Sequence, residues 1–119
     1  MKHETKFDPQ TGIMYMKIKG SYTIEEAIET EKFMKTQTKD RDSYMLLADL
    51  REAPASLDKE VRRRLQGEIA DQELEKVAMI VTNPGVRMIG KIVIATMGKS
   101  KNTRFFKTEE EALAWLKGN

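Results

Sequence analysis

Hydrophobic and polar positions alternate along residues 13–19. Positions 14, 16 and 18 are apolar, whereas the intervening positions carry Tyr15, Lys17 and Lys19. This period of two predicts a strand with one buried face. A Pro- and Gly-containing turn over 8–12 precedes it, so residues 4–8 are expected to pair with it as an edge strand in a hairpin.

Three later segments also predict strands. Residues 44–50 and 77–81 are apolar almost throughout. Such runs are typical of strands buried on both faces, as in the centre of a parallel sheet. A last short strand is expected at 104–106, which contains two phenylalanines.

Helices are predicted between these strands. Thr23 with Glu26, and Thr108 with Glu111, have capping-box spacing, which predicts helices over 24–37 and from 108 to 117. A third helix should follow Pro54, because apolar residues recur there at every fourth position, with Gly67 inside it at a cost of about 1 kcal/mol. That apolar row consists of Leu57, Val61, Leu65 and Ile69.

The resulting element order is β-β-α-β-α-β-α-β-α. Strand–helix alternation after a hairpin predicts an α/β fold: a single mostly parallel sheet of four or five strands, an N-terminal hairpin and about four helices. Elements follow one another closely, so we expect one domain over 1–119, with 1–3 and 118–119 frayed.

The predicted helix over 86–97 has more apolar residues than one core-facing stripe can hold. Several interpretations stay open: a dimer interface, an apolar ligand pocket under a movable helix, a shallow membrane contact, deeper burial within the same domain, or part of the segment being strand. The candidate ligand or partner surface consists of Val86, Met88, Ile89, Ile92, Val93 and Met97.

Composition narrows the chemistry. The 119 residues include no cysteine and one histidine, His3, which argues against thiolate metal sites, cysteine nucleophiles and histidine triads. The charge of 21 basic against 19 acidic residues does not indicate a nucleic-acid partner. No apolar run approaches membrane-spanning length, and the first residues are too polar for a signal peptide. We expect a cytoplasmic protein, peripheral at a membrane if the helix contacts lipid, with no cofactor or metal.

Several polar features have both a structural and a functional interpretation. Arg62, Arg63 and Arg64 could contact an anion or form a solvated helix face. Asp49 and Glu52 lie where catalytic carboxylates often gather, or else cap a loop and face solvent. A turn at 83–85 precedes a helix whose amides could hold an anion, although no phosphate-binding motif is present.

Four segments together resemble SpoIIAA-like proteins. The segment 20–26 resembles the start of their first helix, with its glycine, threonine and acidic pair; 46–50 looks like their central strand, with its Asp; and 77–81 looks like the next strand. The ending 104–116 resembles their most recognisable stretch, an aromatic strand followed by acidic residues and Ala-Trp-Leu.

The resemblance implies the fold of sulfate-transporter and anti-sigma-factor-antagonist (STAS) domains, with helices largely on one side of the sheet. Such antagonists carry a phosphorylated Ser in an Asp-Ser-Gly or Asp-Ser-Ser-Gly motif. Here only Ser56 lies close to that place, without the flanking Asp and Gly. SpoIIAA-like members are also likened to CRAL-TRIO-type lipid-binding folds, which implies an apolar ligand or membrane association.

We therefore expect a binding module without catalytic residues. It would take an apolar or amphipathic small molecule, or a lipid surface, through the helix at 86–97, with Arg62–Arg64 near an anionic head if they share its side. The alternative is a STAS-type regulatory module that dimerises or docks on a partner protein through the same helix.

Overall fold

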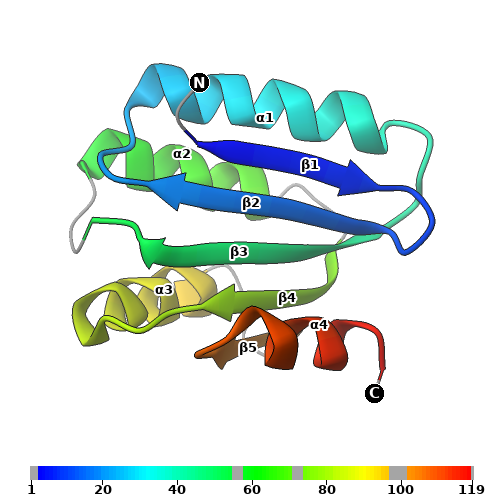
Figure 1. The fold of residues 1–119 in the computed structure, drawn as a ribbon. Helices are drawn as coiled ribbons and strands as arrows, with labels where there is room; N and C mark the ends of the chain where they lie inside the picture. Colours follow the sequence, from blue (N-terminus) through cyan, green and yellow to red (C-terminus); the bar gives the residue numbers. More distant parts are fainter. Residues whose placement is uncertain (1–2, 55–57, 71–73, 97–101, 119) are drawn as a thin grey trace.

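The computed structural model describes residues 3–54, 58–70, 74–96 and 102–118 (Figure 1). Within them the element order is the predicted one. The strands are β1 (Glu4–Asp8), β2 (Ile13–Lys19), β3 (Tyr44–Glu52), β4 (Leu74–Ile80) and β5 (Thr103–Phe106). The helices are α1 (Ile24–Thr38), α2 (Lys59–Ala70), α3 (Pro84–Thr96) and α4 (Glu109–Leu116).

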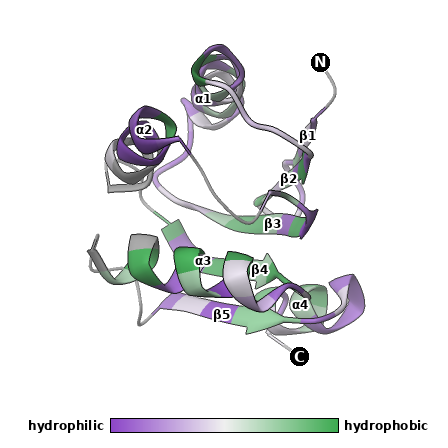
Figure 2. Ribbon diagram, turned by 90° about the vertical axis from the view of Figure 1, so that its left-hand side faces the viewer, coloured by the Kyte–Doolittle hydropathy of each residue, from purple (hydrophilic) through white to green (hydrophobic). Residues whose placement is uncertain are grey.

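The strands form one five-stranded sheet in the order β1-β2-β3-β4-β5. β1 pairs antiparallel with β2, and every other pairing is parallel. The crossovers all proceed in the same direction along the sheet, so right-handed connections place α1, α2 and α3 on one face (Figure 2). The prediction of an α/β, mostly parallel sheet with a hairpin and four helices is confirmed.

The core is divided by the sheet into two layers. On the side of α1–α3, Met14, Leu46 and Val77 pack with Val86 and Ile94 of α3. On the other side, residues of β2, β3 and β4 pack against α4, whose Ala112 and Leu116 are buried. The prediction that β2 has a single buried face is therefore too simple, because Ile13 is fully buried on the α4 side.

Both predicted N-caps are present. At Thr23 the capping box is complete: its hydroxyl accepts the Glu26 amide at 3.2 Å, and the Glu26 carboxylate accepts the Thr23 amide at 2.9 Å. Thr108 accepts the Glu111 amide at 3.2 Å, but the Glu111 carboxylate accepts from the Thr108 hydroxyl at 3.0 Å. These contacts satisfy helix-terminal amides that would otherwise lack partners.

The expectation of a frayed N-terminus is wrong at His3. Its imidazole is fully buried, and its Nδ1 accepts the Lys19 amide at 2.9 Å. Its Nε2 lies 3.1 Å from a Glu26 carboxylate oxygen, and its ring meets the Tyr22 ring edge-on. His3 therefore ties the chain start to β2 and α1.

Candidate functional site

The α3 helix presents a core face and an apolar outer face. Val86, Gly90 and Ile94, spaced by four, are buried against the sheet. Met88 and Ile92, one turn apart, are 66% and 56% exposed. Among the described residues, Met88 and Ile92 are the large hydrophobic side chains that are exposed. The apolar residues of α3 that exceed its core-facing stripe therefore lie at the surface.

The outer face of α3 is also basic. Arg87 and Lys91 are exposed beside Met88 and Ile92, and the helix contains no acidic residue. In Figure 2, α3 is mostly green where the neighbouring α2 is mostly purple. The Arg87 guanidinium carbon lies over the Phe105 ring, 5.6 Å from its centroid, in a cation–π contact.

The amides in the first turn of α3 are capped by the Asn83 side chain and do not form an anion site. The Asn83 side chain accepts the Gly85 amide at 2.8 Å and the Val86 amide at 3.4 Å. These amides are thus already used by a cap. The helix begins at Pro84 rather than at Val86, as is common for proline in the first helical position.

The structure brings together only part of the predicted surface on α3. Met88 and Ile92 lie on it, Ile89 is half-buried, and Val86 is buried in the core, which corrects its assignment to the surface. Val86 follows the periodicity of the buried stripe and packs with the core of the α1–α3 layer. Met97 and the Val93 side chain lie outside the described part of the chain, and so does Ser56.

The arginines of α2 point in different directions. Arg64 pairs with Glu31 of α1, with an Nη2–Oε2 distance of 2.8 Å. Val61 faces the core, so helical geometry places Arg62 on the opposite flank from Arg64, toward α3, and Arg63 outward. α2 contacts α3 on the same face of the sheet. Arg62 and Arg63 therefore share a side of the molecule with the outer face of α3, whereas Arg64 is engaged elsewhere.

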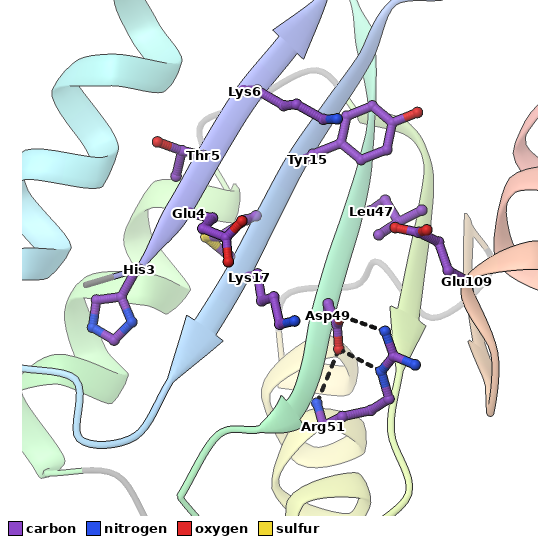
Figure 3. Close-up of a pocket in the computed structure, with 11 residues that line it drawn as sticks. His3, Glu4, Thr5, Lys6, Tyr15, Lys17, Leu47, Asp49, Arg51 and Glu109 are labelled. Carbon is purple, nitrogen blue, oxygen red and sulfur yellow. Dashed lines mark hydrogen bonds and ion pairs between the residues drawn. The ribbon is translucent and has the colours of Figure 1, made fainter. Parts of the chain in front are cut away.

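The opposite face of the sheet carries a hollow that the sequence did not predict. It has a volume of about 600 Å³ and is open to solvent (Figure 3). Of the described helices, α4 covers β3, β4 and β5 and packs on Ile13 at the start of β2, which leaves β1 and the rest of β2 without a helix above them on this side. The side chains that line the hollow include Glu4, Lys6, Tyr15, Lys17, Leu47, Asp49, Arg51 and Glu109.

An ion pair between Asp49 and Arg51 forms one end of this hollow. The Asp49 side chain is 6% exposed and accepts the Arg51 Nε at 3.0 Å, its Nη2 at 2.7 Å and its amide at 3.1 Å. Burial by itself raises the pKa of Asp49, but the hydrogen bonds from Arg51 outweigh it and the net pKa is lowered. The same pairing raises the pKa of Arg51, so both groups are charged at neutral pH.

Asp49 and Glu52 do not form an acid–base pair. Asp49 is engaged by Arg51, whereas Glu52 is exposed and pairs with Lys17 at 3.1 Å. Asp49 does not cap a loop, because β3 continues past it to Glu52. The described residues contain no group of three potential acidic or histidine metal ligands.

The hollow could have been found in part from the sequence. Leu47, Asp49 and Arg51 are spaced by two in a strand, which places them on one face. The register that sets Lys17 opposite Asp49, and the short reach of α4, depend on pairings between distant segments. Those pairings are not visible in local periodicity.

Comparison with solved structures shows the fold. An uncharacterized protein of the DUF3478 family from Shewanella loihica PV-4, with a SpoIIAA-like fold, is 16% identical with a TM-score of 0.74, covering 96% of this chain and 91% of that one. The NMR structure of the protein TM1081 is 15% identical with a TM-score of 0.58, covering 97% and 88%. The predicted SpoIIAA-like fold is confirmed.

Sequence comparison identifies a family but no activity. No curated protein sequence matches the chain. A family model described as a domain of unknown function, DUF7793, matches residues 7–119, which includes α3 and the part of the hollow formed by β2, β3 and α4. The chain, with its SpoIIAA-like sheet, is therefore a member of the DUF7793 family.

Proposed function

We propose that this protein is a non-enzymatic binding module that associates reversibly with an anionic lipid bilayer through the outer face of α3. The observation that carries the proposal is the pairing of Met88 and Ile92, 66% and 56% exposed, with the flanking cations Arg87 and Lys91. Apolar side chains beside basic ones suit the boundary between acyl chains and anionic headgroups.

The charge around this face favours an anionic surface. α3 carries no acidic side chain, and the exposed Arg63 of α2 lies on the same side of the sheet. Each cation close to such a surface contributes about 1 kcal/mol. No helix of the described residues is long and apolar enough to cross a membrane, so the proposed contact is peripheral.

The exposed area sets the strength of the contact. Burying what remains exposed of Met88 and Ile92 contributes about 1–2 kcal/mol each. With two cations the total is about 5 kcal/mol, which corresponds to a dissociation constant near 0.2 mM. The binding is therefore weak, salt-sensitive and reversible.

Vesicle co-sedimentation tests the proposal. Vesicles of phosphatidylcholine with phosphatidylglycerol should retain the protein, and pure phosphatidylcholine should retain much less. Met88→Ser/Ile92→Ser and, separately, Lys91→Gln should each reduce retention several-fold. The matched control Lys117→Gln, at an exposed position after α4, should leave retention unchanged.

Other occupants give different results in the same experiments. Equal retention of native protein and Met88→Ser/Ile92→Ser would overturn the lipid proposal. A concentration-dependent dimer in size-exclusion chromatography that Ile92→Glu disrupts would assign this face to a second copy instead. A small apolar ligand retained in native mass spectrometry would point to a bound molecule rather than to a bilayer.

A further inference from the structure

The hollow on the α4 side of the sheet is built differently from an ordinary solvated sheet face. Its Asp49 is deeply buried, and its Arg51 guanidinium is fixed by two hydrogen bonds, from Nε and Nη2, to that one carboxylate. Such bidentate pairing holds a guanidinium in a defined orientation. Within the described residues, Nη1 of Arg51 makes no hydrogen bond, so this donor remains for a ligand.

Two of the three acidic groups of the hollow already have ion-pair partners. Asp49 is paired with Arg51, and Glu4 with Lys19 at 2.5 Å. Glu109 lies in the first turn of α4, where the helix dipole favours a negative charge. Lys6, in contrast, makes only a cation–π contact with the Tyr15 ring among the described residues, at 4.7 Å. Lys6 and Nη1 of Arg51 are therefore donors of the hollow that make no hydrogen bond among the described residues.

The floor between these charges consists of the half-buried Tyr15 ring and of Leu47, which is only 2% exposed, so Tyr15 supplies its accessible apolar surface. Tyr15 and Leu47 are register partners on neighbouring strands, and Figure 3 shows them between Lys6 at one end and Asp49 with Arg51 at the other. A flat hydrocarbon body would pack on this floor while a carboxylate met Arg51. A phosphate dianion fits less well, because three carboxylates line the same hollow.

We propose that this hollow binds a small organic monocarboxylate with a flat apolar body, held by the Asp49-oriented guanidinium of Arg51 and the Tyr15–Leu47 floor. The site lies on the face of the sheet opposite α3, and it does not depend on the proposed association with lipid.

A titration followed by ¹H–¹⁵N NMR tests this site, with 3-phenylpropionate as the probe. Amide shifts should appear in β1, β2, β3 and the start of α4, with a dissociation constant in the millimolar range or tighter. The neutral isostere 3-phenylpropionamide and the cation phenethylamine should each bind at least tenfold more weakly. Inorganic phosphate should cause smaller shifts at the same amides.

Variants separate this site from the α3 surface. Arg51→Gln should weaken binding about tenfold. Arg51→Gln by itself leaves the Asp49 carboxylate unpaired. The double variant Asp49→Asn/Arg51→Gln therefore serves as a second variant, with a neutral pair that keeps the fold. Lys91→Gln, on α3, should leave the titration unchanged. Equal binding of the amide and the carboxylate, shifts centred on α3, or no shifts up to ~20 mM probe would each overturn the proposal.

Discussion

His3 provides the sharpest test of the structure, because a free N-terminus would make the residue irrelevant to stability. The change is His3→Ala. It removes the acceptor of the Lys19 amide, the contact with Glu26, and the edge-on packing against Tyr22. The alanine leaves the Lys19 amide without its side-chain partner.

The magnitude follows from these contacts. The neutral hydrogen bond is worth about 1 kcal/mol, and the Nε2–Glu26 contact, whose carboxylate is 20% exposed, about 1–1.5 kcal/mol. The aromatic contact adds about 0.5 kcal/mol. We therefore expect the free energy of unfolding to fall by about 3 kcal/mol, which lowers the melting temperature by about 10 °C.

Urea and thermal unfolding followed by circular dichroism measure this loss. His3→Asn should recover part of it, because its carbonyl oxygen can replace Nδ1 as acceptor of the Lys19 amide. Lys39→Ala, at an exposed position, is the control for a generic surface change and should shift the midpoint little. An unchanged midpoint in His3→Ala would refute the reasoning and show that the chain start is not held in solution.

Three further predictions concern stability. Arg51→Met should cost about 2 kcal/mol at neutral pH by leaving the Asp49 carboxylate buried and unpaired. Because the pKa of Asp49 is lowered in the folded protein, the ion pair stabilises the fold fully above the ordinary carboxyl pKa, and this stabilisation is lost as the pH falls. The difference in urea midpoint between native protein and Arg51→Met should therefore shrink toward about pH 3. A difference that stays constant with pH would contradict this prediction. Gly67→Ala should raise the free energy of unfolding by about 0.5–1 kcal/mol, since no atom lies within 4 Å of the added Cβ, and a lower melting temperature would show a hidden clash. Thr23→Ala should lower it by about 1 kcal/mol, seen as reduced urea resistance, whereas an unaltered midpoint would mean that the capping box contributes nothing.

The sequence predicts the architecture because most elements carry strong local signals. The capping box at Thr23 and the apolar run of β3 placed α1 and the central strand within two residues of their observed bounds. β4 begins earlier than predicted, at Leu74, because Lys76 interrupts the apolar run. Lys76 is accommodated in the strand because its Nζ donates a hydrogen bond to the Trp115 carbonyl at 2.9 Å. That carbonyl is brought within reach only by the packing of α4.

The candidate site was only partly predictable, because it depends on how the elements pack as well as on local signals. Periodicity identified α3 as too apolar for one stripe, but which side chains face solvent depends on how the helix is rotated on the sheet. That rotation is fixed by close contacts such as Gly90 against Phe105, where an added Cβ would lie 3.2 Å from the ring. His3 and Arg51 were missed because their partners, Lys19, Glu26 and the hollow, come together only in the folded chain.

Topology explains why the two proposed sites lie on opposite faces of the sheet. Right-handed crossovers proceeding in one direction place α1, α2 and α3 on the same face, so only the terminal helix can cover the other. One helix is about 10 Å wide and spans about two strand spacings of 4.8 Å, so it cannot cover a five-stranded sheet. The uncovered part of β1 and β2 must then be compatible with water, which is why Lys6 and Lys17 occupy positions that a covered strand would fill with apolar residues. An open, charged hollow beside α4 is therefore a consequence of the fold, and Asp49 with Arg51 gives this one a fixed binding group.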